Sequence, residues 1–223
     1  MKRTKLKDRL LPNYTVGEER FNMISHIVGG GFGVIALVLC VIRAALHHDP
    51  WGVVGSAIYG ASLVLLYTVS AVYHGLRVPL GKKVMQVIDH CTIYLLIGGT
   101  YTPLLLTAIR RESPGWAWTI FGIVWGLAAL AAALTAVDLK KYSVFSMICY
   151  IVMGWSIVLA LPTTVRALGR AAFCWLLAGG VAYTVGAVLY GLGKKRRYMH
   201  SVFHLFVLLG SVLQFVCIFF YVL

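Results

Sequence analysis

Three observations predict an all-α membrane protein built as a bundle of seven transmembrane helices. Hydrophobic residues make up 60% of the 223 residues and charged residues only 12%, about half the charged share of an ordinary globular chain. Seven apolar stretches approach the roughly 20 residues that a bilayer span requires. The net charge is +13, and its basic residues gather in alternate connectors. A soluble monomer and a disordered chain are both excluded, because neither tolerates so much apolar surface.

The predicted spans follow one another through short connectors that carry the charges and turn-forming residues. None of the connectors is long enough for a second domain, so we expect a polar, basic arm at 1–23 and one transmembrane domain at 24–223. The first apolar stretch is too long for a signal-peptide core and should remain in the protein. In chain order, the spans are expected at 24–46, 52–75, 84–107, 116–137, 143–161, 171–193 and 199–222, with connectors at 47–50, 79–83, 110–115, 138–141, 162–170 and 194–198.

Positive charge is unevenly divided between the two ends of these spans. Fifteen Lys and Arg residues lie on the N-terminal side and five on the other, which predicts a cytoplasmic N-terminus and an external C-terminus in a multi-pass protein of the cell membrane. Basic loops that face anionic headgroups account for the net charge, so we expect membrane lipids and no nucleic acid as partners. The fifteen are Lys2, Arg3, Lys5, Lys7, Arg9, Arg20, Arg77, Lys82, Lys83, Lys140, Lys141, Lys194, Lys195, Arg196 and Arg197, and the five are Arg43, Arg110, Arg111, Arg166 and Arg170.

Small residues four positions apart indicate where helices approach closely in lipid. We interpret three such pairs as packing contacts within the bundle. A dimerisation face is the alternative, and the oligomeric state stays open. The pairs are Gly29 and Gly33, Ser56 and Gly60, and Gly122 and Gly126.

Ionisable side chains at membrane depth are costly and therefore mark candidate functional sites. Asp89 is the one acidic residue well inside a predicted span. Because successive spans alternate in direction, His74 at the end of the second span lies at the same depth as Asp89. His200 and His204, in the first turns of the seventh span, also reach this depth. Four residues that are distant in sequence therefore meet near the cytoplasmic face.

The histidine spacing fits a metal site. His200 and His204 share a helix face about 6 Å apart along the axis, and His74 supplies a third imidazole. Three nitrogen ligands leave a fourth position open for water, which is the catalytic pattern of zinc, although Fe²⁺ and Mn²⁺ also fit such ligands. Asp89 either binds the metal directly or holds its water. Ser70, one helical turn before His74, lies on the same helix face.

Other polar residues near this depth have simpler interpretations. His90 points about 100° away from Asp89, so we expect it to support the site or bond a neighbouring helix. His26 is expected to make a polar contact at the floor of the bundle. Glu18 and Glu19 are expected to cap the first span or to pair with basic loops. Each candidate ligand alone also fits a bland interpretation, as a histidine at the headgroup level or an aspartate paired with a basic residue.

An ordered set of short motifs covers nearly the whole chain. The motifs are Glu18-Glu19 with Asn22 and His26, Ser70-Ala71-Val72-Tyr73-His74, Asp89-His90 with Gly99-Thr100-Tyr101-Thr102-Pro103, Met153-Gly154-Trp155, and His200-x-x-x-His204.

This set resembles the hemolysin III family, which is related to the progestin and adipoQ receptors and to the alkaline ceramidases. The resemblance implies a seven-helix bundle with a cytoplasmic N-terminus and a zinc ion near that face. It implies zinc ligands at His74, His200 and His204, with the family's aspartate at Asp89 and its serine at Ser70. Ser25 departs from the threonine expected before His26.

These residues predict zinc-dependent hydrolysis of a lipid amide or ester, with enzymatic activity itself an open question. Zinc lowers the pKa of a bound water to about 7 and polarises a carbonyl. Asp89 would take and return the proton, and Ser70 would orient the water or stabilise the oxyanion. The alternatives are a receptor-like or homeostatic protein with structural zinc, and a pore-forming cytolysin. The scarcity of polar stripes argues against the cytolysin.

Overall fold

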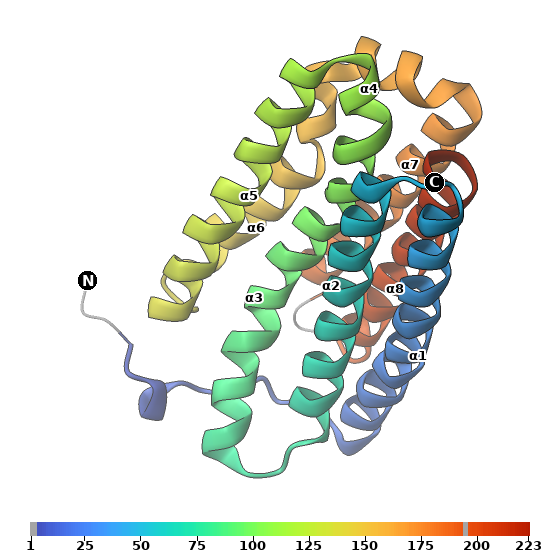
Figure 1. Ribbon diagram of the computed structural model, residues 1–223. Coiled ribbons are helices and arrows are strands. Elements are labelled where there is room, and N and C mark those ends of the chain that lie inside the picture. Colours follow the sequence, from blue (N-terminus) through green and yellow to red (C-terminus); the bar gives the residue numbers. More distant parts are fainter. Residues whose placement is uncertain (1–3, 194–195) are drawn as a thin grey trace.

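The computed structural model describes residues 4–193 and 196–223. Lys2, Arg3, Lys194 and Lys195, which count toward the predicted orientation, lie outside the described residues. All regular structure in the described ranges is helical, and the long helices run side by side as an elongated bundle (Figure 1). The elements are η1 (Leu6–Asp8), α1 (Val16–Leu46), α2 (Pro50–Gly75), α3 (Pro79–Leu104), η2 (Leu105–Ile109), α4 (Arg110–Glu112), α5 (Pro114–Val137), α6 (Ser143–Gly154), η3 (Ser156–Ala160), α7 (Leu161–Leu192), α8 (Met199–Cys217) and η4 (Ile218–Val222).

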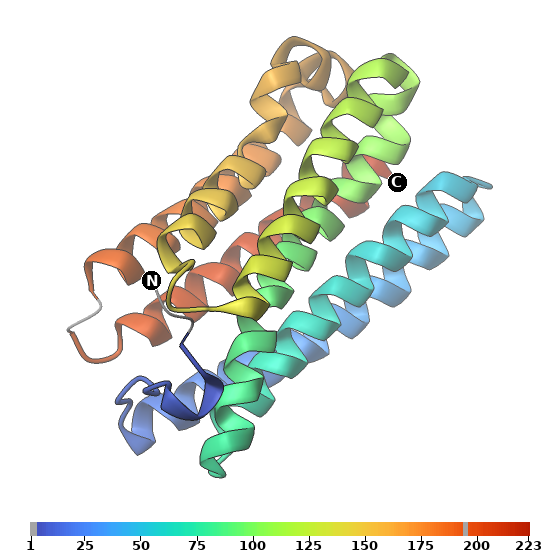
Figure 2. The ribbon, with the colours of Figure 1, turned by 90° about the vertical axis from the view of Figure 1, so that its left-hand side faces the viewer.

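Six helical stretches among the described residues are long and apolar enough to cross a membrane. Five of them correspond to the first four predicted spans and to the seventh. The sixth stretch, Ser143–Leu192, is 50 residues long and contains both the fifth and the sixth predicted spans. In Figure 2 this stretch rises as α6, turns at the top of the view and returns as α7.

The turn within this stretch corrects the predicted boundaries. The chain leaves helical geometry at Gly169, which has φ 74° and ψ 167°, whereas the connector predicted at 162–170 is helical up to that residue. Pro162 starts this helix rather than breaking it, because the first turn of a helix leaves the proline nitrogen without a required hydrogen bond. The predicted fifth span at 143–161 is also interrupted, since α6 ends at Gly154 and η3 follows.

The first long helix begins earlier than the predicted span at 24–46. Thr15 is its N-cap: the Thr15 hydroxyl oxygen accepts a hydrogen bond from the Glu18 backbone at 3.2 Å. The Glu18 carboxylate accepts one from the Thr15 backbone at 2.8 Å. This reciprocal capping box satisfies backbone donors that a helix start otherwise leaves unpaired. The expected capping role of Glu18 is therefore confirmed, and α1 extends beyond the apolar stretch by about two turns.

Close helix packing is confirmed for two of the three predicted small-residue pairs. A methyl group placed on Gly29 would lie 2.5 Å from the Tyr67 ring, and one on Gly60 would lie 2.5 Å from Leu37. These contacts join α1 to α2. By contrast, Gly122 and Gly126 have no neighbouring side chain within 4 Å in the described part of the chain, so the packing predicted for that pair within the bundle is wrong.

Candidate metal centre

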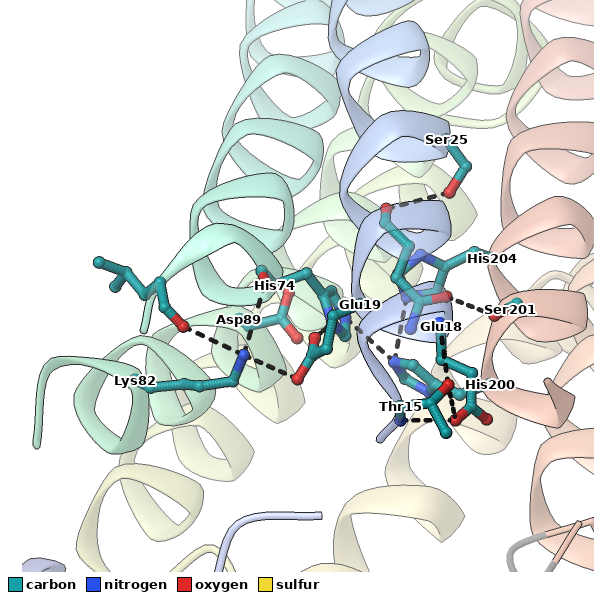
Figure 3. A network of polar contacts seen from close by, with 12 residues as sticks. Thr15, Glu18, Glu19, Ser25, His74, Lys82, Asp89, His200, Ser201 and His204 are labelled. Atoms are coloured by element: carbon teal, nitrogen blue, oxygen red, sulfur yellow. Dashed lines mark hydrogen bonds and ion pairs between the residues drawn. The ribbon is translucent and has the colours of Figure 1, made fainter. Parts of the chain in front are cut away.

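Three imidazoles from two helices meet at the end of the bundle where α1 begins. His74 lies in the last turn of α2, and His200 and His204 lie in the first turns of α8. The Nε2 atom of His200 is 3.3 Å from that of His74 and 3.1 Å from that of His204. His74 and His204 are buried and His200 is half-buried. Figure 3 labels all three residues. The structure thus brings together the three ligands expected from the sequence.

These nitrogen atoms are spaced as a metal ion requires. Tetrahedral zinc with Zn–N bonds of about 2.0–2.1 Å holds its nitrogen ligands about 3.3 Å apart. The ligand atoms of the three histidines all lie within 4.8 Å of one another, so little rearrangement would be needed. The three residues could therefore hold one metal ion, and an all-nitrogen set suits zinc among other divalent metals.

Asp89 lies beside this group rather than within it. Its side chain, from α3, is buried and interacts with the side chain of Ser70 on α2. Among the described residues, the compact group of ligand atoms contains only His74, His200 and His204. Asp89 therefore lies outside the group of ligand atoms that could hold a metal ion.

The two remaining site histidines differ in their contacts. His90 Nδ1 bonds the backbone oxygen of Gln86 at 2.8 Å, one turn earlier on the same helix, so this bond reaches neither the three imidazoles nor a neighbouring helix. His26 instead stacks on His204, with ring centres 3.6 Å apart and planes at 9°. Neither ring nitrogen of His26 has a hydrogen-bond partner among the described residues, so the polar contact predicted for His26 is wrong.

The first turns of α1 hold α8 in place. The Tyr198 backbone nitrogen, at the N-cap of α8, donates to Glu18 Oε1 at 2.6 Å. One turn deeper, the Ser201 hydroxyl donates to Asn22 Oδ1 at 2.7 Å. These bonds fix the start of α8 against α1 and thereby set the depth of His200.

Sequence reasoning did not anticipate the contact that Glu19 makes. Its carboxylate lies 2.6 Å from Nδ1 of His74 and 2.7 Å from the Lys82 ammonium (Figure 3). Pairing with a basic loop was expected, and the Lys82 contact confirms it, but the bond to a candidate ligand was missed. A usable signal was present, because Glu19, Asn22 and His26 are spaced i, i+3 and i+7 and so share one helix face.

The arm before α1 crosses the same end of the bundle (Figure 1). The Thr4 backbone nitrogen donates to Asp138 at 2.7 Å. At the other end of the arm, the Tyr14 ring stacks on His200, with centres 5.1 Å apart and planes at 17°. Burial raises the pKa of the Tyr14 hydroxyl above its ordinary value, so this ring is neutral and covers one side of the imidazole group.

A cavity of about 240 Å³ extends from the imidazoles into the bundle. Asp89, Ser70, His200 and His204 line one part of it, and Gln214 lines another. Gln214 lies about 15 Å from His204 along α8, at 1.5 Å per residue. The chemistry of this site is therefore three imidazoles, a carboxyl group and a hydroxyl group at one end of a mostly apolar space.

Comparisons with known proteins cover the whole site. The family described as "Haemolysin-III related" matches residues 14–215. Hemolysin-3 of Bacillus cereus is 39% identical over 208 residues, which are 93% of this chain and 93% of the relative. The Hemolysin-3 homolog of Bacillus subtilis (strain 168) is 36% identical over 208 residues, 93% of this chain and 96% of that protein. The Monocyte to macrophage differentiation factor of Homo sapiens is 27% identical over 193 residues, 82% and 78% of the two chains. The resemblance read from the motifs is confirmed.

Proposed function

Because this chain belongs to the hemolysin III family, we propose that it is a cell-membrane protein whose three-histidine centre binds Zn²⁺ and hydrolyses a lipid amide or ester. One observation carries the proposal. His200, His204, Asp89 and Ser70 line one largely apolar cavity, and His74 completes a group of three histidines whose ligand atoms lie within 4.8 Å of one another. Perturbed polar groups that converge in such a cavity are the usual mark of a reactive site.

The proposed topology has seven crossings, with the N-terminus in the cytoplasm. The 50-residue stretch Ser143–Leu192 supplies two of them, one on each side of the turn at Gly169. The unequal distribution of Lys and Arg supports the orientation. The metal centre then lies near the cytoplasmic face.

The residues divide the chemistry among them. A zinc ion held by His74, His200 and His204 supplies Lewis acidity, which polarises a carbonyl and makes water more acidic. Asp89 takes the proton from the attacking water and returns it to the leaving group. Ser70, whose side chain interacts with that of Asp89, orients that carboxylate. The apolar cavity holds the acyl chain, and the lipid enters sideways between helices that line it.

The experiment is metal analysis of the purified protein together with hydrolysis assays on a broad lipid panel. His74→Ala and His204→Ala should lose the metal and the activity. His48→Asn is the matched control, because His48 lies at the opposite end of the bundle and Asn tolerates its positive φ of 53°. Metal-loaded protein that turns over none of the lipids, with metal removal leaving its cellular role intact, would refute the hydrolase.

A structural metal is the second candidate, and the packing around the imidazoles favours it. Tyr14 covers His200 and His26 covers His204, and structural zinc sites are closed. Asp89→Ala separates the two functions. Whether the protein is a hydrolase or holds a structural metal, the Asp89→Ala variant should keep its metal content and its fold. Loss of hydrolysis in this variant supports the enzyme. An unchanged cellular role supports a structural metal.

A further inference from the structure

Glu19 joins three elements of the site through one carboxylate. It lies in the first turn of α1 and contacts His74 at the end of α2 through Oε2, at 2.6 Å. Its other oxygen, Oε1, lies 2.7 Å from the ammonium of Lys82 at the start of α3. The His74 side chain is fully buried and that of Glu19 is 20% exposed. A charge-assisted bond in this setting is short and directional.

The choice of ring atom matters for metal binding. A carboxylate accepts hydrogen bonds, so Nδ1 of a neutral His74 must carry the proton. The unprotonated Nε2 atom then faces Nε2 of His200 at 3.3 Å. Glu19 therefore selects the tautomer in which His74 presents its lone pair to the other two imidazoles.

His200 lacks such support. Its Nδ1 atom has no hydrogen-bond partner among the described residues, and its ring is held by stacking with Tyr14. The orientation of His74 thus depends on a hydrogen bond, whereas that of His200 depends on ring packing.

We infer that Glu19 is a positioning residue for the metal centre: it fixes the tautomer and ring orientation of His74, and Lys82 fixes Glu19. This inference rests on the proposed metal binding. The Lys82 ammonium also donates to the backbone oxygens of His74 and Leu76, at 3.4 and 3.2 Å. The same ammonium therefore holds both the carboxylate and the helix end that carries the ligand.

The test measures zinc affinity by chelator competition on the purified full chain. Glu19→Ala should weaken zinc binding roughly 10- to 100-fold, the usual effect of removing a carboxylate that supports a ligand. Glu19→Gln keeps the shape and a neutral acceptor and should lose less. Lys82→Met, which leaves the carboxylate in place, should also lose less. Glu112→Ala is the control, because it breaks a comparable ion pair with Arg166, 2.8 Å long, at the other end of the bundle.

A second measurement does not require metal. In ¹⁵N-histidine NMR spectra of the metal-free protein, the His74 signal, identified by its loss in His74→Ala, should report a proton on Nδ1. Glu19→Ala should give a mixture of both tautomers. If the wild type binds zinc but Glu19→Ala binds it equally tightly or keeps the tautomer, the inference is overturned and the proposed function survives. If the wild type binds no metal, the proposed function itself fails.

Discussion

His26 and His204 lie flat against each other, and the contact gives His26 a role that needs neither of its nitrogens. The rings are 3.6 Å apart at 9°, and His26 is 3% exposed. Neither ring nitrogen of His26 has a hydrogen-bond partner among the described residues, and burying such atoms costs free energy. His26 therefore stabilises the site through ring packing and not through hydrogen bonding. The planar ring supports one face of His204 and limits its rotation.

This packing role predicts different outcomes for two substitutions. His26→Phe keeps a flat ring and removes two unsatisfied nitrogens, so metal affinity should be retained and thermal stability should not fall. His26→Ala removes the stack, which is worth about 0.5–1.5 kcal/mol in aromatic pairs, and should weaken metal binding by about 2- to 12-fold. Zinc competition and thermal unfolding of both variants provide the measurement, and equal losses in both would contradict the packing role.

Asp89 offers a prediction that concerns the reaction rather than the metal. Asp89→Asn keeps the shape of the side chain and the acceptor for Ser70 but removes the general base. Hydrolysis should fall about 10²- to 10⁴-fold, while zinc content stays near the wild-type level because Asp89 lies outside the three-histidine group. Parallel metal analysis and activity assays decide this, and a variant that loses its zinc would show that Asp89 is a ligand after all.

The sequence predicted the three-histidine group but not the residues that support it. His74, His200 and His204 could be found because helix spacing and alternating span direction determine their face and depth. Tyr14 could not, since it lies before the first apolar stretch, where no periodic pattern indicates the path of the chain. Glu19 could have been found only from the helix face that it shares with Asn22 and His26. Whether a ring nitrogen meets a carboxylate or a stacked ring depends on tertiary packing, which residue spacing alone does not determine.

The reversal at Gly169 shows how one residue sets the path of an element. A φ of 74° is in the region that residues with a Cβ rarely adopt. With ψ at 167° this is a conformation that is essentially restricted to glycine. Gly169→Ala should therefore destabilise the protein by about 1–3 kcal/mol, the cost of holding another residue in that conformation. No side chain lies within 4 Å of the position among the described residues, so the strain comes from the backbone alone.

The measurement is unfolding in detergent, with Gly180→Ala as the control. A methyl group placed on Gly180 would also meet nothing within 4 Å in the described chain, but Gly180 lies in regular helix, where alanine is favoured over glycine. The control should be neutral or slightly stabilising. A Gly169→Ala variant as stable as the wild type would show that the turn does not depend on glycine.

At the scale of the helices, the apolar stretches predicted where the long helices lie but not where each one begins and ends. The first long helix begins at Val16 rather than near residue 24, and α7 begins at Leu161 rather than near residue 171. Hydropathy does not predict that α1 starts at Val16, because the capping box at this start is made by the polar residues Thr15 and Glu18. Pro162 resembled a connector residue, yet proline suits the first turn of a helix. Sequence alone cannot distinguish the two uses, since the neighbouring backbone bonds decide between them.

The N-terminal arm is attached to the bundle at Asp138, which directly follows α5. The backbone nitrogens of Thr4 and Lys141 donate to this carboxylate and lower its pKa below the ordinary value. The buried Arg9 contributes in the same direction. Because the folded carboxyl has the lower pKa, the attachment is complete above the ordinary value of about 3.9 and is lost as pH falls through the lowered value.

A spin label at Asn13, which is exposed, should report this release. Its mobility should rise as the pH falls below about 4, while circular dichroism shows that the bundle keeps its helix content. In Asp138→Asn the label should be mobile at every pH. A label whose mobility does not change with pH would contradict the attachment.

The proposed topology of the whole molecule can be examined in intact cells. An epitope tag at the C-terminus should be accessible from outside, and one at the N-terminus should become accessible only after permeabilisation. The reason is the concentration of basic residues on the N-terminal side of the spans. Both tags on one side would mean an even number of crossings, and the 50-residue stretch would then count as a single passage.

The position of the three histidines along the chain also constrains how the protein matures. His74 is synthesised well before the other two, since 126 residues separate it from His200. A growing chain therefore offers one of the three imidazoles until α8 has been translated and inserted. A metal held by all three could be bound only after that step, and its arrival would tie α8 to α2 and so act as a check on assembly.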